Sequence, residues 1–198
     1  MYAYYNENGK KIRFMNTIRL VISDYKKFKK YGGNFITILF FTQGFWAVLQ
    51  HRIAYVIYTN FHLPILRQLL LLLCLCWQKT IEMTTGISIP ASVRIGHSFY
   101  IGHFGGIIIN ANVIMGNNCN ISQGVTIGIS GLEDKRGVPV IGNNVYIGVN
   151  SVVAGKITIG NNVLIGACSL VTHHVTENAV VLGVPAVKIS NKSSKGYI

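Results

Sequence analysis

The sequence reads Ile141-Gly-Asn-Asn-Val-Tyr-Ile147-Gly-Val-Asn-Ser-Val-Val153-Ala-Gly-Lys-Ile-Thr-Ile159-Gly-Asn-Asn-Val-Leu-Ile165 across its second half. An aliphatic residue returns at every sixth position, a small residue usually follows it, and a small or branched residue often stands fifth. The same period begins at Ile89 and continues, with two interruptions, as far as Val171. A hexapeptide period is the sequence signature of a parallel β-helix, a solenoid of short stacked strands.

The geometry of this solenoid follows from the period. We expect each hexad to supply one strand and one turn, so that three hexads make one triangular coil. The first-place side chains point inward and stack between coils, because no single coil can bury its apolar face alone. The Gly or Asn that follows forms the corner, often with a positive φ. The pattern predicts a β-helix over residues 85–189, after an α-helical region over residues 1–84 and before a tail, residues 190–198.

Two interruptions of the period are candidates for a functional site. After Ile101, eight residues replace six, so that two extra residues lie beside His103. Between Ile127 and Ile141 there are fourteen residues where two hexads would span twelve. This second segment is polar, Gly-rich and charged, and we expect residues 128–140 to leave the wall as a loop. Loops on a rigid scaffold are where binding residues concentrate.

The charge of the chain is concentrated in its first part. The net charge is +12, and residues 1–79 carry eleven Lys and Arg against two acids, whereas residues 80–198 carry seven against four. No nucleic-acid-binding motif accompanies this charge, so nucleic acid is not a predicted partner. An anionic membrane surface or an anionic glycan suits the apolar neighbours of the lysines better. The four cysteines form no C-x-x-C pair, so no metal site is predicted.

The first part of the chain reads as helices. A helix is expected from Asn16 to the lysines of residues 26–30, and a second from Phe35 to Tyr58. Pro64 suits the first turn of a third helix. Its apolar run, Ile65 to Trp77, is thirteen residues long, which we interpret as too short to span a bilayer.

Two placements of these helices stay open. They cap the open end of the solenoid and pack between subunits, or they lie on an anionic membrane with the lysines on the headgroups. Residues 1–14 are expected to be a disordered extension. No secretory signal is recognisable, so we expect a cytoplasmic protein, peripheral at the inner face of the membrane if the helices bind lipid.

Several segments resemble the left-handed β-helix acyltransferases. The closest branch looks like the serine O-acetyltransferases and the related polysaccharide O-acetyltransferases of capsule and exopolysaccharide loci. The resemblance implies a left-handed parallel β-helix, a homotrimer, acetyl-CoA as cosubstrate, and active sites between neighbouring subunits. The segments that carry it are Thr85-Gly-Ile-Ser-Ile-Pro, Ile101-Gly-His-Phe-Gly-Gly-Ile, Asn120-Ile-Ser-Gln-Gly-Val-Thr-Ile-Gly and Gly183-Val-Pro-Ala.

The chain departs from the serine acetyltransferase pattern at two places. The resemblance implies an Asp-His pair in the first interruption, with the His as general base. His103 matches this base, whereas Gly102 stands in the place of the Asp. A second His, in an Arg-His-Pro context, is implied before the next repeat, where this chain has Gly137-Val138-Pro139. The Arg and the His missing from this second place contact serine in the family, so the resemblance implies an acceptor other than serine.

We therefore predict an acetyl-CoA-dependent O-acetyltransferase that acts on a sugar hydroxyl of a surface polysaccharide or its precursor. A neutral imidazole can take the hydroxyl proton during direct attack on the thioester, which is the role predicted for His103. The candidates for contacts with the glycan acceptor are the loop residues Glu133, Asp134, Lys135 and Arg136. The candidates for the coenzyme are Gly148, Gly166 and Ala167 along pantetheine and Lys188 at a phosphate. The alternatives are a serine O-acetyltransferase and a non-catalytic β-helix scaffold.

Overall fold

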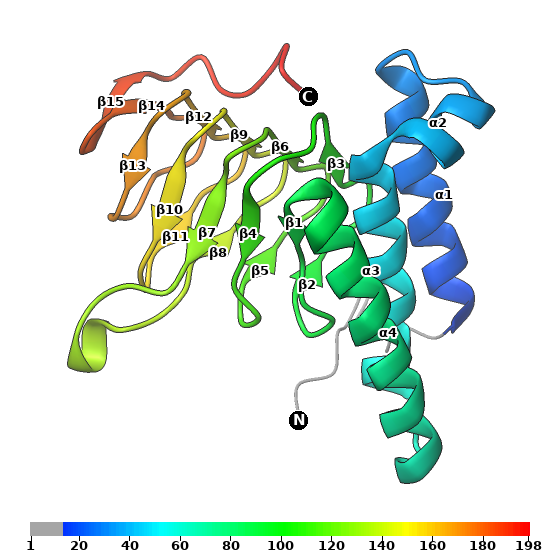
Figure 1. The fold of residues 1–198 in the computed structure, drawn as a ribbon. Coiled ribbons are helices and arrows are strands. Elements are labelled where there is room, and N and C mark those ends of the chain that lie inside the picture. Colours follow the sequence, from blue (N-terminus) through cyan, green and yellow to red (C-terminus); the bar gives the residue numbers. More distant parts are fainter. Residues whose placement is uncertain (1–13) are drawn as a thin grey trace.

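A computed structural model describes residues 14–198 of the chain. Four helices form one block beside the first coils of a triangular β-helix, which extends away from them to the hairpin at its far end (Figure 1). The expected fold class, a left-handed parallel β-helix after an α-helical region, is confirmed. The predicted disordered extension, residues 1–14, lies outside the described residues except for Phe14, which begins α1. The helices are α1 (Phe14–Lys30), α2 (Phe35–Phe41), α3 (Gln43–Asn60) and α4 (Pro64–Thr85).

The second predicted helix is two helices. Asn34 begins α2 with a capping box, in which its side chain accepts a hydrogen bond from the Thr37 backbone while the Thr37 hydroxyl accepts one from the Asn34 backbone. Thr42 has an extended backbone, with φ −103° and ψ 98°, and its hydroxyl donates to the Thr37 carbonyl at 2.9 Å. The chain therefore turns at Thr42, and the apolar periodicity of residues 35–58 did not show this break.

The third helix is longer than the sequence suggested. It continues beyond Trp77 to Thr85, so that α4 has 22 residues. By length and composition α4 could cross a membrane, so the prediction that this segment is too short for a bilayer is wrong. One face of α4 packs on α3, where Gln50 Nε2 donates to the Cys74 carbonyl at 3.1 Å. Several leucines on the rest of α4 are exposed, among them Leu69 and Leu73.

The strands form three parallel sheets that are the walls of the prism. The first sheet contains β1 (Ile87–Ser88), β4 (Ile107–Ile109), β7 (Thr126–Gly128), β10 (Val152–Ala154) and β13 (Leu170–Val171). The second contains β2 (Arg94–Ile95), β5 (Ile114–Met115), β8 (Val140–Ile141) and β11 (Thr158–Ile159). The third contains β3 (Tyr100–Ile101), β6 (Asn120–Ile121), β9 (Tyr146–Ile147), β12 (Leu164–Ile165), β14 (Val180–Gly183) and β15 (Ala186–Ser190). Only β15 runs antiparallel, and it pairs with β14 at the far end of the prism.

The core is the stack of first-place side chains that the period predicts. Full burial of an aliphatic side chain stabilises a fold by roughly 1.5–3 kcal/mol, so this repeated stack is the main stabilising feature of the solenoid. Fifth-place residues such as Val145 and Val163 also point inward and are fully buried. The first-place residues, none more than 4% exposed, are Ile89, Ile95, Ile101, Ile109, Met115, Ile121, Ile127, Ile141, Ile147, Val153, Ile159, Ile165 and Val171.

The asparagines that follow the first place form the corners with a positive φ, as predicted. The positive φ lies at the fourth place of the hexad, as at Asn144 with φ 55° and Asn162 with φ 57°, and not at the second place. The second-place Gly148 is small for another reason, because a Cβ atom there would lie 2.7 Å from the backbone nitrogen of Ala167 in the next coil. Small second-place residues therefore permit the close stacking of coils.

The fourth-place asparagines form a ladder along one corner. Asn118 Nδ2 donates to Asn144 Oδ1 at 2.8 Å, Asn144 donates to Asn162 at 2.9 Å, and Asn162 donates to Asn178 at 3.1 Å. Asparagine tolerates a positive φ and satisfies the corner through its side-chain amide, which explains the repeated Gly-Asn-Asn triplets.

The pairing of strands in neighbouring coils shows how many residues each of the two interruptions adds to its coil. Uninterrupted coils advance by 18 residues, as from Val140 to Thr158, whereas the coil from Ile87 to Ile107 advances by 20. The two extra residues beside His103 are thereby confirmed. The coil from Ile114 to Val140 advances by 26, so the fourteen-residue segment replaces one hexad and not two. The loop is thus eight residues longer than a normal hexad, and the predicted surplus of two was wrong.

Candidate active site

His103 lies in the widened turn between β3 and β4, at the corner where the third and first sheets meet. The turn is anchored by backbone hydrogen bonds, from Gly105 N to Thr85 O and from Gly124 N to Gly105 O, both 2.8 Å long. Gly105 and Gly106 both have positive φ, at 106° and 62°, which is the conformation that glycine tolerates best. The imidazole of His103 is exposed and has no hydrogen bond or ion pair with the rest of residues 14–198. A fixed turn therefore presents a free imidazole.

Gly102 leaves room for the acidic residue that the family resemblance implies. Its φ is not in the left-handed region, so a side chain would not strain the backbone. A Cβ atom at Gly102 would lie 3.3 Å from the ring of Tyr100, a close contact that a small ring movement relieves. The aspartate is therefore missing from the sequence and not excluded by the fold.

Two apolar side chains beside His103 were missed by the sequence analysis. Phe104 is 55% exposed and Ile108 is 53% exposed, next to the same turn. The alternation within β4 would have shown that Ile108 points outward, because Ile107 and Ile109 both point into the core. The surface around the imidazole is therefore partly apolar.

The predicted loop leaves the wall between β7 and β8, at a different corner of the prism from His103 (Figure 1). Its base is closed by two hydrogen bonds between the backbones of Ser130 and Gly137, at 3.0 and 3.1 Å. A 3₁₀ turn, η1 (Glu133–Lys135), forms the tip, and Lys156 Nζ donates to the Asp134 carbonyl at 3.1 Å. All four predicted acceptor contacts, Glu133, Asp134, Lys135 and Arg136, are exposed.

The structure does not bring the loop and His103 together within one chain. Glu133 makes no hydrogen bond to His103 among the described residues, so it does not orient this imidazole in the single subunit. The resemblance implies active sites between neighbouring subunits, and an arrangement in which the loop of one subunit faces the His103 of another stays a prediction.

The predicted coenzyme contacts lie along the later coils. Gly148 is buried beneath the next coil, whereas Gly166 is half-buried and Ala167 is exposed. Lys188 is exposed on β15, opposite Val181 of β14. Gly148, Gly166 and Ala167 follow β9 and β12 of the third sheet as His103 follows β3, so they lie along the same corner of the prism. Their contacts with a coenzyme stay predictions.

A buried ionic cluster joins the helices to the first coil, and the sequence analysis missed it. Arg52 of α3 pairs with Asp24 of α1 at 2.8 Å and donates to the carbonyls of Ile95 and Gly96 at 2.6 Å. Asp24 also accepts from the backbone of Phe99 at 2.8 Å. The sequence signal was the isolated acid in a basic segment, since no Asp or Glu occurs between residues 25 and 81.

The neighbouring His51 is held neutral by its surroundings. Burial, and then the charge of Arg52, lower the pKa of His51 to about 3. This histidine is 1% exposed, where α3 meets the first coil, and solvent does not reach it. Within residues 14–198 no group of three His, Cys, Asp or Glu side chains could hold a metal ion.

Comparison with known proteins identifies related sequences. Residues 139–173 match the family model described as bacterial transferase hexapeptide (six repeats). The serine acetyltransferase of Synechococcus elongatus is 36% identical over 152 residues, which cover 77% of this chain and 59% of that relative. The serine acetyltransferase of Bacillus licheniformis is 32% identical over 162 residues, 82% of this chain and 71% of that relative. The putative colanic acid biosynthesis acetyltransferase WcaB of Escherichia coli is 42% identical over 105 residues, 53% of this chain and 64% of that relative. The chain thus spans less than two thirds of the first of these relatives.

Solved structures show the same similarity in three dimensions. The serine acetyltransferase of Neisseria gonorrhoeae matches with a TM-score of 0.78 and 30% identity, over 89% of this chain and 66% of that chain. A serine acetyltransferase in complex with CoA matches with a TM-score of 0.75 and 27% identity, over 89% of this chain and 71% of that chain. A match of this extent includes helices as well as coils.

Proposed function

Because the chain belongs to the hexapeptide-repeat transferases, among the homologues of serine acetyltransferase, we propose that it transfers an acetyl group from acetyl-CoA to the hydroxyl group of an acceptor. The observation that carries the proposal is His103, an exposed imidazole without a partner in the described chain, on a turn that is fixed by its backbone. A CoA complex among the similar structures supports the choice of acyl donor.

His103 acts as the general base in this proposal. Its neutral imidazole accepts the proton of the acceptor hydroxyl while the oxygen attacks the thioester carbonyl. The C–S bond then breaks, and the imidazolium returns the proton to the departing CoA sulfur. General base catalysis of this kind contributes typically 10²–10⁴-fold to a rate, and no covalent enzyme intermediate is required.

The active site is proposed to lie between the subunits of a trimer. Within one chain the loop of residues 128–140 lies at another corner from His103, so a single subunit does not surround the imidazole. A neighbouring copy that presents this loop to the widened turn would supply the second wall and the candidate acceptor contacts. The exposed Phe104 and Ile108 would be covered in the same arrangement.

The first acceptor to test is L-serine. The relatives that match most of this chain are named serine acetyltransferases, and so are the similar structures. This support favours serine over the sugar acceptor that the sequence analysis preferred.

A sugar hydroxyl is the second candidate, because specific residues favour it. Gly102 and Val138 stand where the resemblance implies the Asp and the His that serve serine. The WcaB relative, named for colanic acid biosynthesis, is more identical over a shorter segment. Cytoplasmic location and contact of the helices with an anionic membrane stay predictions.

The experiment measures release of the CoA thiol from acetyl-CoA with serine and with a panel of sugars and nucleotide sugars. We expect turnover with one acceptor class and a fall of about 10²–10⁴-fold in the His103→Ala variant. His173→Ala is the matched control, since His173 is exposed on a distant turn and makes no hydrogen bond in the described chain. Full turnover in His103→Ala would refute the mechanism, and absence of turnover with every acceptor would favour a scaffold.

A further inference from the structure

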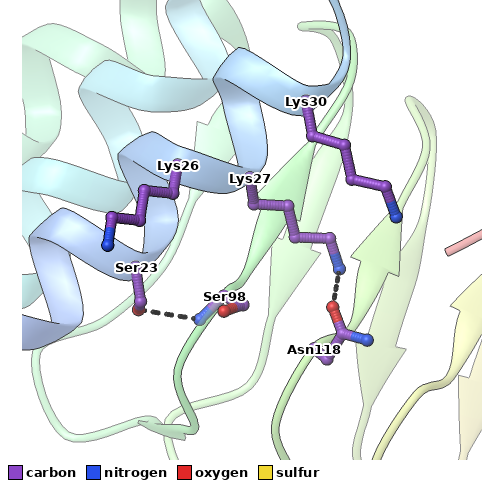
Figure 2. A pocket seen from close by; sticks show the side chains of 6 residues that line it. All are labelled: Ser23, Lys26, Lys27, Lys30, Ser98 and Asn118. Atoms are coloured by element: carbon purple, nitrogen blue, oxygen red, sulfur yellow. Dashed lines mark hydrogen bonds between the residues drawn. The ribbon is translucent and has the colours of Figure 1, made fainter.

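A basic pocket lies where the C-terminal half of α1 crosses the corner that begins the asparagine ladder. The cavity has a volume of about 270 Å³ and is lined by Ser23, Lys26, Lys27, Lys30, Ser98 and Asn118. Figure 2 shows Lys27 and Lys30 extending from α1 toward the side of Asn118, with Ser23 and Ser98 on the other side. The pocket is at a different corner from the widened turn that holds His103.

The lysines of this pocket form no ion pair in the described part of the chain. The two ion pairs among residues 14–198 are Arg52 with Asp24 and Lys79 with Glu82, so none of the pocket lysines has a carboxylate partner. The nearest acid in sequence is Asp24, whose two oxygens already accept from Arg52 and from the backbone of Phe99. Three lysines and no acidic residue therefore line the pocket, with the ammonium groups of Lys27 and Lys30 on the side of Asn118 and that of Lys26 on the side of Ser23 (Figure 2).

Lys27 is the informative member of the three. The residue is only 5% exposed, yet its ammonium makes one hydrogen bond in the described chain, to Asn118 Oδ1 at 2.6 Å. An ammonium has three N–H donors, so two are left for another partner. Burial lowers the pKa of Lys27 to about 8, and the neighbouring Lys30 adds to this lowering. A buried cation in this situation gains free energy when an anion approaches it.

A purely structural role explains part of this arrangement. Lys27 satisfies the first acceptor of the asparagine ladder, because Asn118 has no asparagine in the coil before it. Lysines in the last turn of a helix also interact favourably with the helix dipole, which applies to Lys27, Lys29 and Lys30. The hydrogen bond to Asn118 does not need a cation, since a neutral amide could donate it, and the helix dipole favours a cation without requiring its burial. The buried charge is what remains unexplained.

The hydrogen bonds of the Ser23 hydroxyl limit which donors the pocket can offer to a ligand. Ser23 Oγ accepts from the Ser98 backbone at 3.1 Å and donates to the Leu20 carbonyl at 2.7 Å, so it has no proton left for a ligand. The free donors are thus mainly ammonium groups, which suit an ion with several acceptor oxygens. A volume near 270 Å³ is below that of typical pockets for drug-sized molecules, and it suits a single phosphate group.

We propose that the pocket between Lys26, Lys27, Lys30 and Ser98 binds a phosphate group, as a free phosphate or as the phosphate of a lipid headgroup. A second feature supports a lipid headgroup as the source of the phosphate. Helix α2 follows α1 directly in the sequence, and its Phe40 and Phe41 are 58% and 71% exposed. Aromatic side chains beside lysines are typical of surfaces that lie at a membrane interface. The site is independent of acetyl transfer, so its failure would leave the proposed function untouched.

The test measures binding to the intact chain in two arms. Calorimetry with inorganic phosphate detects the free ion, and co-sedimentation with vesicles of phosphatidylcholine, with and without phosphatidylglycerol, detects a headgroup. Lys27→Gln keeps an amide donor for Asn118 and removes the buried charge, and we expect it to weaken binding about tenfold or more. The double variant Lys26→Gln/Lys30→Gln changes only exposed residues. It replaces Lys27→Gln in the binding test if Lys27→Gln lowers the stability of the fold.

Lys29→Gln is the matched control, because Lys29 is exposed on the same helix and does not line the pocket. Phosphate binding that the pocket variants lose and Lys29→Gln keeps would support the proposal with a free ion. Binding only to anionic vesicles, with the same pattern of variants, would support it with a lipid headgroup. Absence of binding in both arms would overturn the proposal, and so would equal losses in the pocket variants and in Lys29→Gln.

Discussion

The first-place stack inside the β-helix consists of aliphatic side chains and one methionine, whereas the interface between the helices and the first coils buries Asp24, Arg52, Lys27 and His51. The first region repeats one contact in every coil, so each residue there has near-equivalents above and below. The second region contains contacts that occur once, between α1, α3 and the β2–β3 corner. Apolar stacking tolerates the loss of one member better than a buried ion pair does. Four substitutions test this contrast, in order of their expected effect on stability.

The largest effect is expected from Asp24→Ala. The variant leaves the guanidinium of Arg52 buried without its carboxylate, which typically costs about 3–5 kcal/mol of unfolding free energy. Denaturant unfolding of Asp24→Ala and of the exposed control Glu177→Ala measures this cost. A loss below about 1 kcal/mol would mean that water or another residue replaces the carboxylate, and that the ionic cluster does not hold the helices to the coils.

A smaller effect is expected in the apolar stack. Ile127 is fully buried in β7, and Ile127→Ala should cost about 2–4 kcal/mol through lost burial and a cavity between coils. Ile108→Ala is the matched control, because Ile108 is on the same sheet but points outward and is 53% exposed. The control should change the unfolding free energy by less than about 0.5 kcal/mol. Similar losses in both variants would show that Ile108 is also buried, as it would be against a neighbouring subunit.

Acid should lower the stability of the interface between the helices and the first coils, because His51 is buried there in its neutral form. The folded protein protonates His51 only near pH 3, whereas the unfolded chain protonates it below about 6.5. The unfolded state therefore binds more protons between these values, so stability is complete above pH 6.5 and falls with acid by up to about 1.4 kcal/mol per pH unit. His51→Phe should remove this part of the slope, measured as the difference between the two unfolding curves from pH 7 to pH 4. Parallel curves would show that His51 does not resist protonation.

The sequence predicted the repetitive region almost completely and the unique region poorly. The hexad period identified the first-place core residues from Ile89 to Val171, because stacking imposes the same requirement on each coil, but it did not identify Val175 and Val181, which pair with Ile159 and Ile165. The period did not give the length of the second interruption, since a count along the chain cannot show whether Val140 pairs with Ile114. The pairing of Asp24 with Arg52 joins residues 28 positions apart, and no local pattern records it.

The candidate site was predicted in part for the same reason. The two extra residues beside His103 were visible in the sequence as an interruption of the hexad period, and the pairing of Ile87 with Ile107 confirms this interruption. The loop of residues 128–140 was predicted from its composition, and the role of its residues as acceptor contacts stays a prediction. The corner of the prism at which the loop lies depends on which strand the chain forms after it. Helix α4 was underestimated because Gln78, Lys79 and Glu82 interrupt the apolar run while the backbone continues as helix.

The smallest effect on stability is expected from His103→Ala. The imidazole makes no hydrogen bond or ion pair with the rest of the described chain, and its turn is fixed by the backbone of Gly105. The unfolding free energy should therefore change by less than about 0.5 kcal/mol, although acetyl transfer should be lost under the proposed mechanism. Thermal unfolding and thiol release, measured on the same preparation, separate the two. A clear loss of stability would show that His103 is held by contacts within an oligomer. The ring nitrogens of His103 would then form structural hydrogen bonds, and another residue would have to act as the general base.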